Sequence, residues 1–415
     1  MGTDLIGDQN QVGKGDNDMQ IKNDSNAMAL LGSCLNRLIE KGGSDLYIKS
    51  DATIRARVEG DVVPLCEERI SAESMEQIAQ ALAGKRYEEF LDTGEFDTVH
   101  VLDDASRFRV NIYKHLEGIG VVCRLIPHVI KGFEELNLPS ELNRLARLNR
   151  GLVLVTGTTG SGKSTTLAAI VEKINQERQR HIVTIEDPVE YTHNDKLSII
   201  EQRGVGQHTQ SFATALRAAM REAPDIIVVG EMRDVETAES VLQAVNTGHL
   251  VFSTLHTLDA RETIDRMIAM FPELEQNRVR MNLASNLQAV VSQRLIKGKH
   301  GGLLPAVEIL FKSPRTEFMI RAMRDNELPD AMEAERNTFG SVTFNTALFE
   351  LCLADKITEE EAFNYATSSS DLKLMFTKSA EYNAKLLREG SMELDEVDIK
   401  EEEEEAKLPP LEEPL

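Results

Sequence analysis

Gly157-Thr158-Thr159-Gly160-Ser161-Gly162-Lys163-Ser164, with Thr165 next in line, sets the architecture expected of this chain. The loop follows the apolar run Leu152–Val155 and precedes a helix-like segment, which gives the order strand, glycine-rich loop, helix. Glycines let a loop fold tightly enough for its backbone N–H groups to surround phosphate oxygens, and the helix adds the positive end of its dipole. The pattern G-x-x-x-x-G-K-S therefore predicts that Gly157 to Thr165 bind a nucleoside triphosphate. Lys163 would reach the β- and γ-phosphates, and the Ser164 hydroxyl would ligate Mg²⁺.

Length and composition indicate a globular protein of two domains with terminal extensions. The chain has 415 residues, of which 41% are hydrophobic, and no apolar run reaches the ~18 residues of a membrane span. The first residues lack the basic and apolar regions of a secretory signal. The cysteines lack paired C-x-x-C spacing, which favours ordinary buried thiols in a reducing cytoplasm over a zinc site or disulfides. They are Cys34, Cys66, Cys123 and Cys352.

Charge is unevenly distributed along the chain. The net charge is −23, of which −9 falls in the last 28 residues, so we expect residues 379–415 to form an acidic and mostly disordered tail. Residues 1–26 are polar and are expected to be a disordered leader, either native or left from cloning. The remainder is also acidic, which argues against a broad basic surface for nucleic acid, although an oligomer could assemble a local basic pore.

The hydrophobic pattern changes once along the chain. Residues 27–127 combine a helix that begins near Ala27, short alternating strands and a further helix or helix pair at Ser74–Leu91, which predicts a small α+β domain. After a linker at 128–139, residues 140–378 alternate apolar strands with amphipathic helices, as parallel sheets do. Beyond Pro272 we expect mainly helix, including one through Gln276–Ile296. The strands expected in this second domain are Leu152–Val155, His181–Ile185, Ile226–Val229 and Leu250–Ser253.

Two strand ends supply the carboxylates that hydrolysis would need. Thr184–Tyr191 places three acids, among them Glu190, at the carboxyl end of a strand, where ligands bind in open parallel sheets. Such a cluster could equally be a solvated loop. In Pro224–Asp234 a buried strand ends in Gly230-Glu231, so the usual aspartate position holds glycine and Glu231 is the acid at the tip.

A histidine precedes and another follows the strand in Gly248–Thr257. These are His249 and His256. A single histidine is usually structural, whereas a pair beside a nucleotide site could report the state of the γ-phosphate.

These motifs together resemble the signatures of the secretion-superfamily ATPases of type II secretion and type IV pili. Met220–Asp234 resembles their Walker-B signature, Glu186–Glu190 their Asp box and Gly248–Thr257 their His box, and the similarity covers about residues 28–378. The short N-terminal domain and the lack of a four-cysteine insert point to the retraction (twitching motility) group, PilT and PilU. Thr343-Phe344-Asn345 and Ser369–Leu374 look more like PilU.

The resemblance implies an α/β fold: a PAS-like N-terminal α+β domain and a RecA-like P-loop ATPase domain with a helical C-terminal part. It further implies that Glu190 activates the attacking water and that Glu231 is the Walker-B glutamate. His249 and His256 match the His-box residues.

Arginines of the small domain act near the phosphates in this family, and Arg109 and Arg124 occupy matching positions. The position of a third family arginine is Glu117, which puts a complete arginine set in doubt. Arg217 and Arg221 lie near the same motifs in the sequence and could be structural ion-pair partners.

By resemblance, the protein is expected to be a homo-hexameric, ATP- and Mg²⁺-dependent motor for pilus retraction. Its partners would be a paralogous retraction ATPase and the inner-membrane platform protein of the pilus machine. It would be cytoplasmic, peripheral to the membrane, and would not bind nucleic acid directly. The alternatives are an extension, secretion or DNA-transfer ATPase and an accessory subunit that modulates a partner ATPase.

Overall fold

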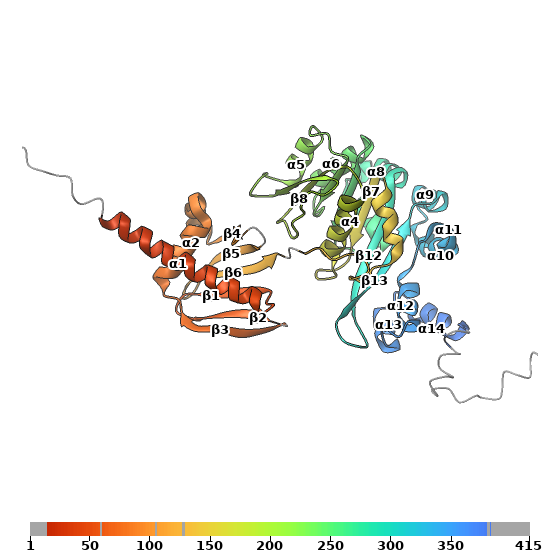
Figure 1. Ribbon diagram of the computed structural model, residues 1–415. Helices are drawn as coiled ribbons and strands as arrows, with labels where there is room; N and C mark the ends of the chain where they lie inside the picture. The colour runs from red at the N-terminus through yellow and green to blue at the C-terminus, as the bar shows by residue number, and fades with distance from the viewer. Residues whose placement is uncertain (1–14, 59, 104–105, 127–128, 380–381, 383–415) are drawn as a thin grey trace, which may run out of the picture. The chain divides into compact units, whose positions relative to one another are not determined.

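The computed structural model describes residues 15–58, 60–103, 106–126, 129–379 and 382 (Figure 1). Most of the expected leader and tail therefore lies outside the described residues. Helix α1 (Gly15–Glu40) begins twelve residues before the start expected near Ala27. Nucleation is the unfavourable step of helix formation, and the part of α1 that packs on the sheet provides the nucleus. No proline interrupts the residues before it, so the helix extends towards the N-terminus.

The chain separates into two compact units. One comprises Met1–Glu135, Leu142–Val153 and Ser164–Thr254, and the other comprises Leu136–Glu141, Leu154–Lys163 and Leu255–Leu415.

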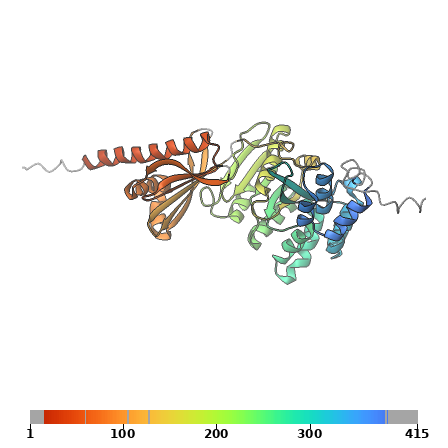
Figure 2. The ribbon, with the colours of Figure 1, turned by 90° about the horizontal axis from the view of Figure 1, so that it is seen from below.

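The first unit contains an antiparallel sheet in the order β3-β2-β1-β6-β5-β4. Its helices are α1, α2 (Ala72–Ala83) and α3 (Tyr87–Thr93). Side chains alternate along each strand, so one face is apolar and packs with α1 and α2 (Figures 1 and 2). This confirms the expected α+β domain. The strands are β1 (Asp45–Lys49), β2 (Thr53–Val58), β3 (Asp61–Arg69), β4 (Glu95–Val101), β5 (Arg107–His115) and β6 (Gly118–Ile126).

The remaining strands form a seven-stranded sheet in the order β13-β12-β7-β11-β10-β8-β9. Strands β9, β8, β10 and β11 run parallel in register, as the alternating pattern predicts, whereas β12 and β13 are antiparallel. The strands are β7 (Gly151–Thr156), β8 (His181–Glu186), β9 (Ile199–Gly204), β10 (Ile226–Val229), β11 (Leu250–Leu255), β12 (Leu287–Lys297) and β13 (Leu303–Phe311).

Three of the helices that accompany these strands begin at polar caps. The side chains of Ser211, Asp234 and Asp259 accept hydrogen bonds from backbone N–H groups in the first turns of α5, α6 and α7. The helices are α4 (Lys163–Glu177), α5 (Phe212–Ala219), α6 (Val235–Asn246), α7 (Ala260–Ala269) and α8 (Glu273–Asn286).

The expected helix through Gln276–Ile296 is wrong in its second half. Helix α8 ends at Asn286, and residues 287–297 form β12, which pairs with β13 from Ala289↔Phe311 to Lys297↔Leu303. The β-branched pair Val290-Val291 suits a strand, and the long hairpin partner outweighs the helical pattern of the preceding residues. Strand β9 was not expected either, because Ile199–Gly204 lacks a buried apolar run.

The C-terminal part is helical, as expected. Its last three helices pack around Ile296 of β12 and Ala306 of β13 through a cluster that includes the aromatic rings of Phe344 and Phe376. Figure 1 shows these helices beside the hairpin of β12 and β13. The helices are α9 (Pro314–Arg321), α10 (Leu328–Ala334), α11 (Arg336–Phe339), α12 (Phe344–Leu353), α13 (Glu359–Tyr365) and α14 (Ser369–Lys378).

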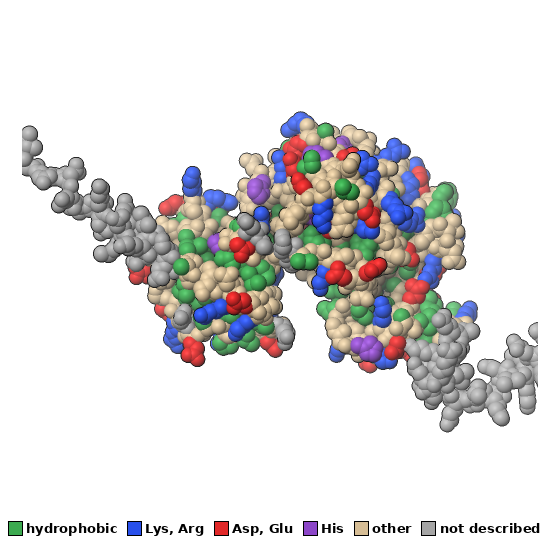
Figure 3. All heavy atoms as spheres, in the orientation of Figure 1, with side chains coloured by type: hydrophobic (Ala, Val, Ile, Leu, Met, Phe, Trp, Pro, Cys, Tyr) green, Lys and Arg blue, Asp and Glu red, His purple; other side chains and the backbone are tan. Residues whose placement is uncertain are grey.

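The surface drawn in Figure 3 carries charges of both signs, and the cysteines are present as thiols. On the face drawn in Figure 3, basic and acidic side chains are interspersed. None of the four cysteines forms a disulfide, and three of them are buried. Among the described residues, no helix is long and apolar enough to cross a membrane.

Candidate active site

The phosphate loop begins where the fully buried strand β7 ends. Gly157 has φ +144°, and a Cβ there would lie 2.4 Å from the backbone oxygen of Gln293 and 2.5 Å from Ser161 Oγ. Gly162 has φ +89°, and a Cβ there would lie 2.8 Å from Gln293 Nε2. Glycine is therefore required at Gly157, because the backbone of β12 approaches too closely for a side chain, and it is favoured at Gly162 by the positive φ.

Two polar groups of this loop are poised for an anion. Lys163 is buried, and its Nζ donates to the backbone oxygens of Gly157 and Thr158, each at 2.9 Å. Ser161 Oγ is buried and has no hydrogen-bond partner in the described part of the chain. A buried hydroxyl without a partner is costly, and a phosphate oxygen would satisfy it. Since α4 also begins at Lys163, the loop fits a phosphate chain.

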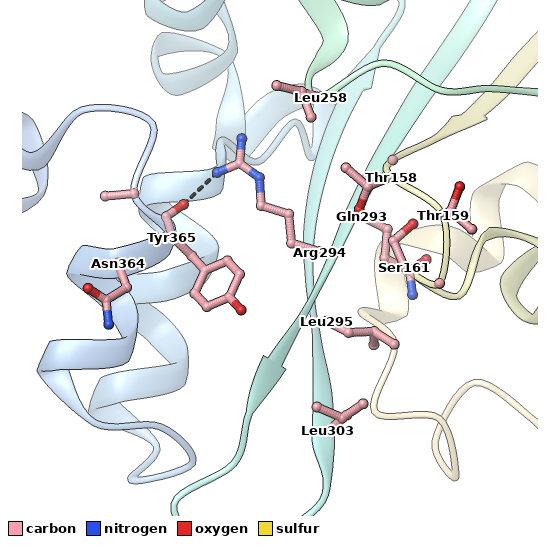
Figure 4. A pocket seen from close by; sticks show the side chains of 13 residues that line it. Thr158, Thr159, Ser161, Leu258, Gln293, Arg294, Leu295, Leu303, Asn364 and Tyr365 are labelled. Atoms are coloured by element: carbon pink, nitrogen blue, oxygen red, sulfur yellow. Dashed lines mark hydrogen bonds between the residues drawn. The ribbon is translucent and has the colours of Figure 1, made fainter. Parts of the chain in front are cut away.

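A cavity of about 520 Å³ adjoins the outer side of the loop (Figure 4). Figure 4 shows Leu258, Arg294 and Tyr365 around a space that faces Thr158 and Thr159. Arg294 Nη1 donates to the backbone oxygen of Tyr365 at 2.5 Å, which ties β12 to the end of α13. Leu258 and Tyr365 are 50% and 37% exposed, so the cavity presents apolar surface to solvent. A volume and lining of this kind suit a small ligand.

Gly230, which follows the carboxyl end of β10 and precedes Glu231, is tied to the strands on both sides of β10. Gly230 N donates to the backbone oxygen of Ile185 at 2.8 Å, and Thr254 Oγ1 donates to the Gly230 oxygen at 2.5 Å. A Cβ at Gly230 would lie 3.3 Å from the Glu186 Cα and from the Ile185 oxygen. This crowding gives a physical reason why glycine replaces the usual aspartate. Ser253, at the same strand ends, has a buried Oγ with no partner in the described part of the chain.

Glu231 follows Gly230 and is only 13% exposed. Its Oε2 is 2.7 Å from Nε of Arg233, whose side chain is 72% exposed. The carboxylate is therefore held near the carboxyl end of β10 by a partner that water can reach.

Glu190 is exposed, and its loop is anchored to Glu186 at the end of β8. Glu190 N donates to Glu186 Oε2 at 3.2 Å, while Thr184 Oγ1 and Gln202 Nε2 donate to Glu186 Oε1 at 2.7 and 3.2 Å. Burial raises the pKa of Glu186, and these hydrogen bonds oppose the rise. The side chain that projects into solvent is thus Glu190, and Glu186 supports its backbone.

The two histidines lie at opposite ends of β11. His256 follows the carboxyl end of the strand, whereas His249 precedes its start, roughly 20 Å away along a strand of this length. His249 Nδ1 lies 3.0 Å from the Ala244 oxygen and 3.0 Å from Thr247 Oγ1, beside the end of α6. The structure therefore does not bring His249 to the strand ends that carry Glu186 and Glu231.

Arg109 and Arg124 are direct cross-strand neighbours on β5 and β6. Arg124 Nε donates to Oδ1 of the buried Asp45 at 2.6 Å, and this hydrogen bond raises the pKa of Arg124. Glu117 lies in the turn between these two strands, and its carboxylate pairs with Lys49 at 3.1 Å. The position of the third family arginine therefore carries an acid paired with a lysine. The structure brings the two arginines together on the sheet face opposite the apolar one.

The other two arginines near the motifs have structural partners. Arg217 pairs with Glu236 at 3.0 Å, and Arg221 Nη1 donates to the Arg217 oxygen at 3.1 Å.

Sequence reasoning missed the residues that hold the Glu190 loop in place. Thr165 Oγ1 and Tyr191 OH lie 2.8 Å apart, and Glu172 receives hydrogen bonds from the same loop further along α4. One signal was present in the sequence. Thr165, Glu172 and Gln176 recur at i, i+7 and i+11, which puts these polar residues on one face of an otherwise buried helix.

Comparison with known proteins gives this site its family. The family model described as "Type II/IV secretion system protein" matches residues 20–324. The type IV pilus retraction ATPase PilT of Pseudomonas aeruginosa is 42% identical over 318 residues, which cover 76% of this chain and 90% of that protein. PilU of the same organism is 36% identical over 352 residues, which cover 84% of this chain and 92% of that protein. The chain belongs to the PilT/PilU group of the type II/IV secretion system family.

Structural comparison agrees with this assignment. A solved structure of the pilus retraction motor PilT with bound ADP superimposes with a TM-score of 0.76 and 37% identity, covering 82% of this chain and 98% of that one. The fold expected from the sequence is confirmed, and the chain is a nucleotide-binding ATPase of this family.

Proposed function

We propose that this protein is a homo-hexameric ATPase motor that powers type IV pilus retraction and twitching motility. One observation carries the proposal: the buried Lys163 with its glycine loop occurs in the same chain as Glu190 and Glu231 at the strand ends. The name of the PilT relative, a pilus retraction ATPase, supports retraction rather than extension, and a relative from Neisseria gonorrhoeae named a twitching motility protein supports the role in motility.

In the proposed cycle the phosphates of ATP lie on Gly157 to Thr165. Lys163 turns from its own loop's oxygens to the β- and γ-phosphates, and the N-terminus of α4 stabilises the added charge. Mg²⁺ prefers hard oxygen ligands, and the Ser164 hydroxyl and the Glu231 carboxylate, directly or through water, would hold it. When bound, Mg²⁺ would neutralise charge on the phosphate oxygens.

Glu190 is proposed to orient and deprotonate the attacking water. Its exposed carboxylate suits that role, since it can reach a water molecule while Glu186 fixes its backbone. Arg109 and Arg124 would act from a neighbouring subunit, where a guanidinium stabilises the charge of the transition state.

The cavity beside the loop is proposed to hold the adenosine half of the nucleotide. Tyr365 and Leu258 supply aromatic and apolar surface, and Arg294 frames the cavity. Binding there would cover side chains that are otherwise exposed.

Rigid-body shifts between subunits would convert this chemistry into force on the inner-membrane platform protein of the pilus machine. The protein would act in the cytoplasm, peripheral to the inner membrane. The match to PilU covers more of this chain, 84% against 76%, whereas PilT is more identical, 42% against 36%. A PilU-like role beside a paralogous ATPase is proposed from the resemblance of Thr343–Asn345 and Ser369–Leu374 to PilU. An accessory subunit without autonomous turnover is the second candidate.

The deciding experiment is deletion of the gene in the native host, with twitching and surface pili as readouts. Excess surface pili without motility are expected of a retraction motor. Absent pili would identify an extension motor and would contradict the proposal. Complementation with a Glu190→Gln variant should fail to restore motility, while a wild-type copy restores it. Phosphate release by the purified protein, alone and with a retraction ATPase, separates an autonomous motor from an accessory subunit.

A further inference from the structure

The segment that carries Glu190 has no regular structure, yet hydrogen bonds hold it at Glu190 and Tyr191 and again from His193 to Lys196. Residues 187–198 connect β8 to β9 and contain neither helix nor strand. A segment of this kind fluctuates unless side chains hold it. The position of Glu190 therefore depends on the bonds that its neighbours make.

The far end of this segment is fixed to the middle of α4. Glu172 is buried and accepts hydrogen bonds from Lys196 Nζ and from Gln176 Nε2, and its Oε2 lies 3.2 Å from His193 Nδ1. Burial alone would raise the pKa of Glu172, but these hydrogen bonds lower it to about 2. Asn175 adds bonds to the backbone of residues 194 and 196. Glu172 is therefore ionised at neutral pH and can accept all of its hydrogen bonds at this end of the segment.

The near end is held at Glu190 and Tyr191 by three hydrogen bonds, of which one reaches Thr165 beside the phosphate loop. Tyr191 OH lies 2.8 Å from Thr165 Oγ1 in the first turn of α4, directly after Ser164. The backbone oxygen of Tyr191 accepts from Gln202 Nε2 at 2.8 Å, and the same amide group donates to Glu186. The backbone is therefore held on both sides of the Glu190 side chain. Glu186 binds the N–H of Glu190, and Gln202 and Thr165 bind the next residue, Tyr191.

Thr165 belongs to the loop that takes the phosphates in the function proposed above, and the inference rests on that function. A threonine hydroxyl has one proton to donate and two lone pairs to accept with. When Thr165 donates its only proton to a phosphate oxygen, it must be the acceptor in its pair with Tyr191, so the Tyr191 hydroxyl becomes the donor. Without a phosphate either atom can donate, and the pair is not fixed in direction.

We propose that Tyr191 is a positioning residue that transmits occupancy of the phosphate loop to Glu190. A bound nucleotide fixes the Thr165 hydroxyl, which fixes the Tyr191 hydroxyl, which holds the backbone beside Glu190 in the arrangement that hydrolysis needs. Tyr191 itself does not touch the reacting atoms. The second attachment at Glu172 keeps the rest of the segment in place, so the coupling is confined to residues next to Glu190.

The test variant is Tyr191→Phe, which removes the hydroxyl and keeps the ring. The expected result is a fall in kcat of about fivefold to tenfold, the rate equivalent of one hydrogen bond, with the KM for ATP changed less than about twofold. The matched control is Tyr87→Phe, which removes the same atom from a tyrosine of α3 and should leave kcat unchanged. A wild-type kcat in Tyr191→Phe would overturn the proposal. A loss of kcat accompanied by weaker ADP binding would also overturn it, because a general structural role would explain both.

Hydrogen–deuterium exchange supplies a readout that a purely structural role would not change. In the wild type, MgADP should slow exchange both in residues 157–165 and in residues 188–193. In Tyr191→Phe the first segment should still respond and the second should lose its response. A preserved response of residues 188–193 in this variant would contradict the coupling. If MgADP protects neither segment in the wild type, the nucleotide site itself is refuted and the coupling fails with it.

Discussion

Glu308 provides a test of the energetics in which the magnitude follows from the structure. It lies on β13 with 7% of its surface exposed and accepts from the backbone N–H groups of Ala260 and Phe344, at the starts of α7 and α12. Burial raises its pKa to about 7 from a reference of 4.5, against the opposing effect of these N–H groups. Between pH 4.5 and about 7, Glu308 is therefore protonated in the folded protein and ionised in the unfolded chain. Stability should fall as pH rises through this window, by about 3 kcal/mol in all, and stay level above it.

The perturbation is Glu308→Gln, which keeps an oxygen for the two N–H groups and mimics the protonated acid at every pH. We expect the variant and the wild type to have similar stability at pH 5, and the variant to be more stable by up to about 3 kcal/mol at pH 8. Urea denaturation at the two pH values measures the difference, with the exposed Glu360→Gln as a control that should shift by less than about 0.5 kcal/mol. A variant that is no more stable than the wild type at pH 8 would refute the reasoning.

Three further predictions concern the loop, the Walker-B tip and the N-terminal sheet. Lys163→Ala should lower ATP turnover at least about a hundredfold, since it removes the charge that faces the phosphates; phosphate release measures this. Gly230→Ala should destabilise the protein by about 1–3 kcal/mol in denaturation, because its Cβ would crowd the backbone of β8. Asp45→Ala should cost only about 1 kcal/mol of stability, because Arg124 is 65% exposed and regains water; a loss above about 3 kcal/mol would show that the pair is more tightly buried than the structure indicates.

The parts of this fold that the sequence predicts are those governed by local patterns. The phosphate loop is recognisable because its glycines, lysine and serine are consecutive and its flanks are a buried strand and a helix. The alternating strands of the N-terminal sheet are visible because one face of each is apolar. In both cases the residues that decide the structure are neighbours in the chain.

The features that escape prediction depend on partners far away in the chain. Residues 287–297 form a strand because β13 pairs with them, and nothing in their own pattern forces that choice over a helix. His249 matches its motif, yet the direction of β11 places it at the far end from Glu231. The contact between Thr165 and Tyr191 joins residues 26 positions apart and needs the geometry of α4 and the following loop. A motif match therefore suggests which site a residue belongs to, but the fold decides whether its side chain lies at that site.

The most direct test of the central claim is a comparison of ATP binding and ATP turnover in purified wild type and Glu190→Gln. We predict that the variant binds ATP as the wild type does. The Glu190 side chain is exposed, and its backbone N–H is held by Glu186, a bond that the substitution to glutamine leaves in place. The turnover of the variant should fall about a hundredfold or more, as expected when a general base is removed. Turnover in Glu190→Gln equal to that of an active wild type would contradict the assignment of this strand end as the hydrolytic half of the site.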